Sequence, residues 1–476
     1  MKKIFTILLA LFLTKASTAQ GYSITVQAKG YKGGLTYFTY YSGSNLNIQD
    51  SAIMKKNGSV VFTGKTKLLG GIYVLVLSDK RRVDFLIDKE QKINITLDST
   101  DLVFKTTITG SKENVLYQQY QKFVTTKGRL RDNARRAYMA ATNKADSALH
   151  EKNYNNYSNE MSVYREGIVT KQPKSMMAAL LQAMKDPQVL MQNPITREDS
   201  LNNFYYYKTH YWDGITFMDD RLIRTPFFTP KLQRYYTDIV VQADSVIKDI
   251  DYKLLLARNS PELYKYMLNW LTDFYLNPKY MGQDAVLVHL FNNYHSKGLS
   301  PWLNEKQMEF ISRRAYMTMS NLIGEMAANL EFIDANDKPK PLYELDAEYT
   351  VVCFWDPNCG HCKTEVPRVD SIYQASWKSK GVKIYAVLTP ESYINIKEDW
   401  QKFIAEKKLT EWTHVWQTKA MADADNAAQK ASYRQLYDIT STPILYLLDK
   451  NKRIVGKKLT VLQLNDLLEF KIKNNK

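Results

Sequence analysis

Cysteine is scarce in this sequence: its 476 residues contain three, at Cys353, Cys359 and Cys362. So few thiols exclude a disulfide-stapled scaffold, and the chain is long enough to bury several cores without staples. Cys359 and Cys362 are separated by only two residues, and a disulfide closing so short a loop stabilises a fold little. A zinc site needs a second Cys or His pair at suitable spacing, and His414 stands alone. The cysteines therefore indicate chemistry at one place rather than cross-links.

Long apolar runs are also missing, except at the N-terminus. Lys2 and Lys3 precede a nearly uninterrupted apolar stretch at 4–13, and small residues follow at 16–19. This is the layout of a secretory signal peptide. The stretch has about half of the ~20 residues that a membrane-spanning helix needs, and no cysteine follows it to carry a lipid. We expect residues 1–19 to be cleaved, and the mature protein to be exported to the periplasm or cell envelope without being an integral membrane protein.

Acidic residues are outnumbered by basic ones, and the formal net charge is +16. Such a balance can attract anionic membranes or acidic partners. The basic residues are scattered, however, apart from short runs such as Lys80-Arg81-Arg82. The pattern is typical of a solvated basic surface, and an exported protein rarely meets nucleic acid. We therefore expect no nucleic-acid partner.

Periodicity predicts a multidomain protein with three structural parts. Residues 20–110 form short alternating runs separated by turn signals such as Asn57-Gly58, which predicts an all-β, sandwich-like domain ending in a strand at 103–108. Residues 111–323 show helical spacing, many prolines between segments and tyrosine clusters best explained by packing, and they predict an all-α domain. Residues 324–476 alternate strands with helices, including a helix at 428–437, and predict an α/β domain with a mixed sheet.

Cys359 and Cys362 directly follow an apolar strand at 350–355 and open a helix. A thiolate at a helix N-terminus faces unpaired backbone N–H groups and the positive end of the helix dipole, which lowers the thiol pKa. We expect Cys359 to be the exposed nucleophile and Cys362, one turn further on, to be the buried thiol that resolves a mixed disulfide. His361 between them can add positive charge or a hydrogen bond.

A second signal lies downstream, at Ser441-Thr442-Pro443-Ile444. Proline at the start of an apolar strand cannot be an ordinary central ladder residue, and a cis-proline in a tight turn would explain it.

Together these motifs make residues 324–476 similar to the thioredoxin-like domains of the disulfide-reductase type found in cytochrome c maturation. The segment Cys359-Gly360-His361-Cys362-Lys363-Thr364-Glu365-Val366-Pro367 resembles that family's Cys-x-x-Cys-x-x-Glu-x-Pro motif. The resemblance implies disulfide exchange with protein thiols and disulfides, with Glu365 as an active-site acid that tunes the thiols. It also implies that Thr442 and Pro443 face the cysteines and hold a substrate strand, while Trp355 packs beneath the site. No organic cofactor and no metal are implied, because the redox couple is the cysteine pair.

Two further comparisons refine this resemblance. Gly360-His361 is similar to protein disulfide isomerases, and Cys353 occupies the position of a buried Asp in thioredoxin, so proton transfer must use another group or water. The segments 211–215 and 220–226 resemble the signature of a helical domain of unknown function. The whole layout is similar to exported Bacteroidetes proteins that join a small β domain, that helical domain and a thioredoxin-like domain.

Three alternatives remain open. A thiol peroxidase would share the fold, but the peroxiredoxin pattern Pro-x-x-x-Thr-x-x-Cys meets Val352 and Asp356 here in place of its Pro and Thr. An envelope binding or assembly module with a secondary redox domain is favoured by the tyrosine-rich middle, and a purely structural disulfide is the third. The sequence leaves open whether the pair reduces, oxidises or isomerises substrate disulfides, because the reduction potentials of Cys-x-x-Cys pairs range from about −270 to −120 mV. It also leaves open the substrate, the membrane electron partner and the oligomeric state.

Overall fold

The computed structural model describes residues 21–31 and 33–474, so the predicted signal peptide lies outside the described residues. The chain forms two compact units. The first contains the described residues up to Val240 together with Tyr252–Tyr266, and the second contains Val241–Asp251 together with the residues from Met267 onward.

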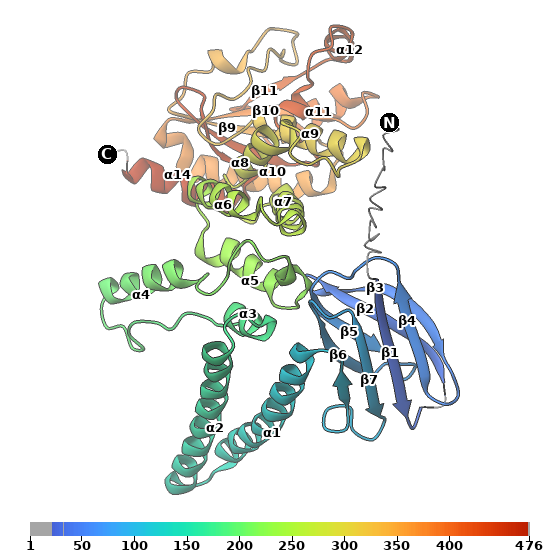
Figure 1. Ribbon diagram of the computed structural model, residues 1–476. Coiled ribbons are helices and arrows are strands. Elements are labelled where there is room, and N and C mark those ends of the chain that lie inside the picture. Colours follow the sequence, from blue (N-terminus) through green and yellow to red (C-terminus); the bar gives the residue numbers. More distant parts are fainter. Residues whose placement is uncertain (1–20, 32, 475–476) are drawn as a thin grey trace, which may run out of the picture. The chain divides into compact units, whose positions relative to one another are not determined.

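The first unit begins with a β-sandwich (Figure 1). Its strands are β1 Tyr22–Lys29, β2 Gly34–Ser42, β3 Asn45–Met54, β4 Ser59–Gly64, β5 Gly71–Val76, β6 Arg82–Ile87, β7 Lys92–Asp98 and β8 Thr107–Thr109. They form two four-stranded sheets, in the orders β4-β1-β7-β8 and β3-β2-β5-β6. One hydrophobic core joins both sheets and includes Ile24, Phe38, Phe62 and Phe85. The alternating pattern of β1, with every second side chain buried, explains why one face of each sheet supplies the core.

The sandwich differs from the sequence-based expectation in two places. Strand β3 was not expected, because most of its residues are exposed and half are polar, and among the described strands it pairs with β2 alone. The strand expected at 103–108 is wrong in extent, since β8 covers only Thr107–Thr109. The carboxylate of Asp101 accepts the N–H groups of Val103 and Phe104 at 3.0 and 2.9 Å and so holds these residues in a turn.

The helical part of the first unit starts with two long helices that pack as an antiparallel pair, as Figure 1 shows. Stacked rings of Phe123 and Tyr164 and an ion pair between Lys127 and Glu160 join the two helices. The helical elements up to the second unit are α1 Lys112–Ala140, α2 Lys144–Lys171, α3 Met176–Ala183, α4 Arg197–His210, η1 Asp220–Arg224, α5 Phe228–Arg234, η2 Tyr235–Ile239, α6 Ala243–Ala257 and α7 Pro261–Leu276. Helices α6 and α7 contribute residues to both units.

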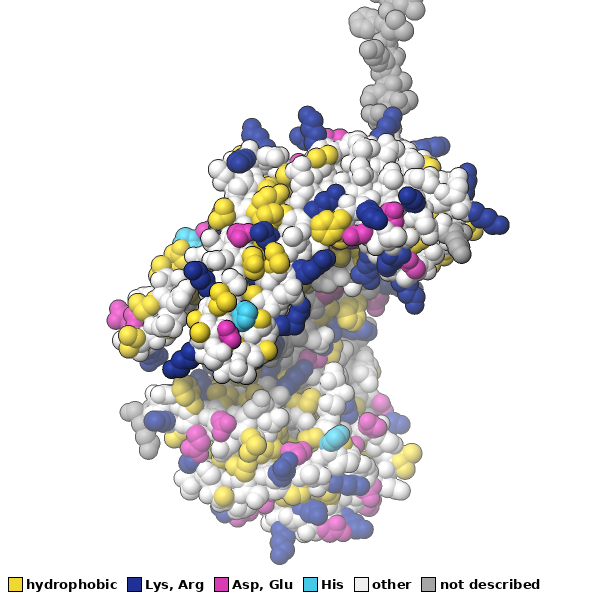
Figure 2. All heavy atoms as spheres, turned by 90° about the horizontal axis from the view of Figure 1, so that it is seen from below, with side chains coloured by type: hydrophobic (Ala, Val, Ile, Leu, Met, Phe, Trp, Pro, Cys, Tyr) yellow, Lys and Arg dark blue, Asp and Glu magenta, His cyan; other side chains and the backbone are white. Residues whose placement is uncertain are grey.

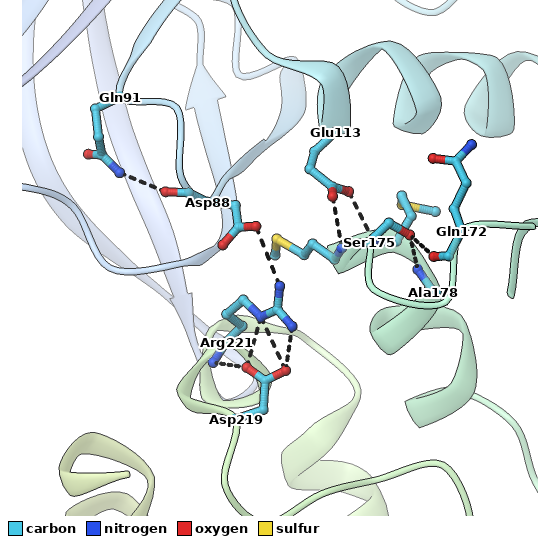
Figure 3. A network of polar contacts seen from close by, with 10 residues as sticks. Asp88, Gln91, Glu113, Gln172, Ser175, Ala178, Asp219 and Arg221 are labelled. Carbon is cyan, nitrogen blue, oxygen red and sulfur yellow. Dashed lines mark hydrogen bonds and ion pairs between the residues drawn. The ribbon is translucent and has the colours of Figure 1, made fainter.

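A polar network ties these helices together and to the sandwich (Figure 3). The Glu113 carboxylate on α1 accepts the N–H groups of Met176 and Met177 at 3.0 and 3.2 Å, and so caps the start of α3. Nearby, the Arg221 guanidinium binds the Asp219 carboxylate at 2.7 Å and reaches Asp88, which follows β6, at 3.5 Å. Long-range charged contacts therefore fix where the helical segments meet the sandwich.

The aromatic residues of this region pack around a buried lysine. Lys253 is only 4% exposed, and its ammonium lies 4.5 Å from the ring centre of Tyr235, 5.4 Å from Trp212 and 5.5 Å from Phe217. A cation over several ring faces is attracted by their quadrupoles, which offsets part of its desolvation. Trp212, Phe217 and Tyr235 therefore serve internal packing, which is the role expected from the sequence for the tyrosine cluster at 235–236.

The second unit contains the predicted α/β domain. Its elements after α7 are α8 Asp284–Leu290, η3 Phe291–His295, α9 Glu305–Met319, η4 Leu342–Glu344, β9 Tyr349–Trp355, α10 Gly360–Ile372, η5 Tyr373–Trp377, η6 Lys378–Lys380, β10 Val382–Leu388, α11 Ile396–Glu406, β11 Thr413–Trp416, α12 Lys419–Ala427, α13 Tyr433–Leu436, β12 Ile444–Asp449, β13 Ile454–Lys457 and α14 Val461–Asn474. The five-stranded sheet has the order β11-β10-β9-β12-β13, with β10 parallel and β12 antiparallel to β9. Every residue of β9 is buried, as expected for a central strand covered on both faces.

Alternate residues of β9 belong to two hydrophobic cores, one on each face of the sheet. Val351, Cys353 and Trp355 belong to a core that includes residues of α10, α11 and α14. Val352 and Phe354 belong to the core on the other face. The helix expected at 428–437 is wrong in extent: α13 covers only Tyr433–Leu436 and begins at the Ser432 cap. Helix α12, capped by Thr418, ends before this range, at Ala427. The fold is nevertheless the predicted one, with β sheets, a helical region and a thioredoxin fold in chain order.

Two surface features bear on partners. Among the described residues no helix is long and apolar enough to cross a membrane. On the face shown in Figure 2, Lys and Arg side chains are interspersed with acidic and apolar ones rather than gathered in one patch.

The cap on α3 gives a stability prediction. We expect Glu113→Ala to lower the free energy of unfolding of the first unit by about 1–2 kcal/mol, because two helix N–H groups lose their acceptor. Urea unfolding followed by circular dichroism measures the change. Glu151→Ala, an exposed substitution on α2, is the matched control and should shift stability by less than about 0.5 kcal/mol. Equal shifts in the two variants would contradict the capping role.

Candidate active site

The cysteine pair lies where the central strand gives way to a helix. Strand β9 ends at Trp355, whose carbonyl accepts the N–H of Thr389 at 2.7 Å after the end of β10. The chain then turns, with the Cys359 N–H donating to the carbonyl of Asp356 at 3.1 Å. Helix α10 begins at Gly360, and Cys359 is its N-cap residue. The geometry therefore places Cys359 against the unpaired N–H groups of the first helical turn.

The two thiols of the pair have opposite environments. Cys359 is partly exposed and its thiol donates to the Thr442 carbonyl at 3.3 Å. Partial burial raises the pKa of Cys359, but hydrogen bonds from the Thr442 side chain, from Cys362 and from the His361 N–H outweigh it, so the pKa lies below its usual value. Cys362 is fully buried, and burial raises its pKa to about 12 although the Asp356 N–H donates to its sulfur at 3.5 Å. Cys359 is thus the thiol that ionises first.

The downstream turn meets the pair as expected. The Thr442–Pro443 peptide bond is cis, as predicted from the sequence, and Thr442 contacts Cys359 directly. Both residues are partly exposed, so backbone groups of this turn lie beside the nucleophile and next to solvent. The fold therefore brings together Cys359, Cys362 and Thr442-Pro443 from segments more than 80 residues apart.

The other predicted site residues lie around this centre. His361 is exposed on the first turn of α10. Glu365, one turn further on, pairs with Arg368 at 2.8 Å, and its side chain keeps 33% of its exposure. Trp355 is fully buried and packs against Phe403 and His414. It therefore has no surface for direct contact with a substrate and can only support the residues that do make contact.

Cys353 lies in the same core as Cys362 and has no exposed surface. Burial raises its pKa well above the usual value, and the proximity of Cys362 raises it further. Cys353 therefore remains a protonated thiol at neutral pH. All three cysteines are free in this structure.

Sequence reasoning missed two residues that hold the site together. The buried carboxylate of Asp356 accepts the N–H of Asn358 at 2.8 Å and that of Glu391, after β10, at 3.3 Å. Arg434 donates to the carbonyls of Thr389 and Pro390 at 3.2 and 2.9 Å. The position of Asp356, between a buried strand and the cysteine pair, could have pointed to its role. No local pattern in the sequence indicates the contacts of Arg434 with Thr389 and Pro390.

The histidines outside the motif are not arranged as metal ligands. Among the described residues no group of three or more His, Cys, Asp or Glu side chains could hold a metal ion. His295 lies between the hydroxyls of Thr272 and Ser300, and His414 contacts the Leu409 carbonyl. Burial lowers the pKa of both imidazoles to about 4, so both are neutral at neutral pH.

Comparison with protein families gives two matches. Residues 22–117 match a domain of unknown function, DUF4369, and residues 323–457 match the AhpC/TSA family. The comparison with curated proteins gave no match.

Solved structures give further similarities. A domain of a possible thiol-disulfide isomerase from Cytophaga hutchinsonii is 31% identical, covers 32% of this chain and 95% of its own, and has a TM-score of 0.26. A thiol:disulfide interchange protein from a Bacteroides species is 30% identical and has a TM-score of 0.27; the match covers 32% of this chain and 90% of the other. A thioredoxin-like protein from Bacteroides caccae is 21% identical and has a TM-score of 0.45; the match covers 60% of this chain and 99% of the other.

A thiol pair at the start of a helix, after a central strand and opposite a cis-proline, defines a thioredoxin-like redox enzyme. Through residues 323–457 the chain belongs to the AhpC/TSA family of such proteins, and it is an enzyme of the thiol–disulfide oxidoreductase class.

The contrast between the two thiols predicts selective alkylation. At neutral pH we expect iodoacetamide to modify Cys359 of the reduced protein while Cys362 and Cys353 stay unmodified, because a lowered pKa gives thiolate at lower pH. Peptide mass spectrometry at a series of pH values measures this. Denatured protein, in which all three thiols should react, is the control. Modification of Cys362 as fast as Cys359 would rule out the assignment.

The loop contacts of Asp356 predict a structural effect. Asp356→Ala leaves two partly buried N–H groups without this acceptor, and we expect a loss of about 1–2 kcal/mol in the free energy of unfolding of the second unit. Urea unfolding followed by tryptophan fluorescence measures it. Asp423→Ala, an exposed change on α12, is the control and should be nearly neutral. A neutral Asp356→Ala would show that the loops hold their positions without this carboxylate.

Proposed function

We propose that this protein is an exported thiol–disulfide oxidoreductase that exchanges disulfides with protein substrates in the periplasm. The observation that carries the proposal is the asymmetry of the pair. Cys359 is accessible with a lowered pKa, and Cys362 is buried with a raised one. This is the division of labour between an attacking and a resolving thiol.

The proposed reaction transfers two electrons between the cysteine pair and the substrate. The Cys359 thiolate attacks one sulfur of a substrate disulfide, forms a mixed disulfide and releases the other sulfur as a thiolate. Cys362 then loses its proton and attacks the sulfur of Cys359, which releases the second substrate thiolate. Two electrons have passed to the substrate, and the pair is left as a disulfide. The reverse sequence oxidises a substrate dithiol.

Neighbouring residues have proposed roles in these steps. Thr442 and Pro443 hold an extended substrate segment beside Cys359, because the turn lies against this thiol and is partly exposed. Glu365 carries protons between solvent and the resolving thiol, and exposed His361 stabilises the thiolate when protonated. Cys353, a buried protonated thiol, takes no part in the exchange.

The proposed location rests on the N-terminal sequence. The basic, apolar and small segments within residues 1–19 have the layout of an export signal. In the periplasm a reductase needs electrons from a membrane protein, and an oxidase must pass electrons to one. The partners of the proposal are therefore protein thiols and disulfides together with a membrane electron donor or acceptor.

The family match makes peroxide reduction the second candidate. Members of this fold that reduce peroxide carry Pro and Thr before the reactive cysteine, and here those positions are Val352 and Asp356. Because Asp356 binds the N–H groups of Asn358 and Glu391, it maintains the loop and is not free to act on a peroxide. Disulfide exchange is therefore the better supported reaction.

Cysteine variants test the proposed mechanism. We expect Cys359→Ser to lower catalysed reduction of insulin disulfides to the uncatalysed rate, because the attacking thiolate is lost. We expect Cys362→Ser to accumulate a mixed disulfide that dithiothreitol releases, because the resolving thiol is lost. Turbidity and non-reducing gels measure the two outcomes.

The matched control is Cys353→Ala, which removes the third thiol and should retain turnover. Consumption of hydrogen peroxide, measured in parallel, should be slow in the unaltered protein. Turnover that survives in Cys359→Ser, or peroxide consumption faster than disulfide exchange, would reject disulfide exchange as the main activity.

A further inference from the structure

A glycine pair brings two arginines against the β-sandwich, far in sequence from the cysteine pair. A Cβ atom on Gly70 would lie 2.6 Å from Cγ of Arg221, and one on Gly71 would lie 2.2 Å from Cβ of Arg224. Gly70-Gly71 therefore does more than form the turn before β5: it leaves room for the arginines of η1. The Gly43 N–H also donates to the Ile223 carbonyl at 3.0 Å, and Arg221 reaches Asp88, as Figure 3 shows. The first unit thus holds η1 firmly on the sandwich.

Beside Arg224 the surface of this unit is hollowed into a pocket of about 420 Å³. This volume lies in the range of small-molecule sites, about 300–1,000 Å³. The aromatic lining comes from Tyr22, Tyr40 and Tyr73, and the exposed Lys65 and Lys67 stand at its rim. Burial raises the pKa of Tyr22 and of Tyr73, so both hydroxyls stay protonated at neutral pH.

The charge of Arg224 is poorly compensated within the protein. The residue is 9% exposed, and its Nη1 has no hydrogen-bond partner among the described residues. Its Nη2 lies 3.8 Å from the half-exposed carboxylate of Glu262, too far for a hydrogen bond. Asp220 also faces it, but burial raises the pKa of Asp220, which weakens that carboxylate as a counter-ion. The guanidinium lies over the ring of Tyr40, at 5.8 Å from its centre.

A buried charge is costly unless it is paired and hydrogen-bonded. A guanidinium presents its N–H groups as a planar fork that matches the oxygens of a carboxylate or phosphate. Two lysines at the rim add positive charge where a ligand would enter, and tyrosine hydroxyls and rings suit a ligand with both polar groups and carbon surface. Every charged side chain that lines this pocket is basic.

We propose that this pocket binds a small ligand that carries a carboxylate or phosphate group, with Arg224 as its anion-binding residue and Lys65 and Lys67 at its entrance. The site gives the N-terminal domain a ligand-binding function of its own. It is independent of the proposed disulfide exchange, since it uses no residue of the cysteine site.

Isothermal titration of the full chain at low ionic strength tests the site. The probes are inorganic phosphate and glucuronate, with glucose as the neutral counterpart of glucuronate. We expect saturable binding of at least one anion and none of glucose. Lys65→Glu combined with Lys67→Glu should weaken binding about tenfold or more, the effect of losing one charge-assisted hydrogen bond. Arg224→Lys, which keeps the charge but removes the fork, should weaken it as well.

The matched control is Lys55→Glu combined with Lys56→Glu, two exposed lysines of the same domain in the turn between β3 and β4. This variant undergoes the same change of net charge and should bind as the unaltered protein does. Both lysine variants change exposed residues, so the comparison stands even where Arg224→Lys fails to fold. Binding of phosphate alone assigns a phosphate ligand, and binding of glucuronate alone assigns a carboxylate. No saturable binding of either anion, or equal losses in the two lysine variants, would overturn the proposal.

Discussion

The redox centre depends on one structural constraint: a strand buried on both faces ends where a helix begins, with a cysteine at the junction. Burial of β9 fixes the position of the loop that follows it, and the N-cap geometry gives Cys359 the N–H groups that favour its thiolate. One turn further on, the same helix points Cys362 into the core that β9 helps to form. The reactivity of the pair is thus a consequence of the surroundings, since two identical side chains acquire opposite pKa shifts: burial raises the pKa of Cys362, and hydrogen bonds lower that of Cys359.

Several Lys and Arg side chains are buried or partly buried, and the groups that stabilise their positive charge differ from one place to another. Lys253 is surrounded by aromatic rings, and Arg221 is matched by Asp219 and Asp88. The carboxylate of Glu262 is 3.8 Å from Arg224, and Nη1 of Arg224 has no hydrogen-bond partner among the described residues, whereas each guanidinium nitrogen of Arg221 has a carboxylate acceptor. This contrast within a single short helical segment sets the pocket beside Arg224 apart from the structural ion pairs around it.

Sequence patterns predicted those parts of the protein in which local signals and tertiary packing agree. The strand at 350–355, the helix after it and the cis-proline turn were all predicted, because apolar runs, helix-start residues and proline act within a few positions. Strand β3 was missed because an exposed edge strand carries no core pattern. The helix expected at 428–437 was predicted too long because the Ser432 side chain caps its start further along the chain.

By itself the sequence determined the chemistry of the site: two thiols at helix-start spacing, with a proline turn downstream, specify a thioredoxin-like pair. The tertiary structure decided which groups surround these thiols, because the contacts of Asp356 with Glu391 and of Arg434 with Pro390 join segments far apart in the chain. It also decided that Gly70-Gly71, besides forming a turn, leaves space for the side chains of Arg221 and Arg224 to pack against the backbone. The physical reason is the same in each case, since local residue patterns encode backbone conformation, whereas burial and charge compensation depend on what the rest of the chain places nearby.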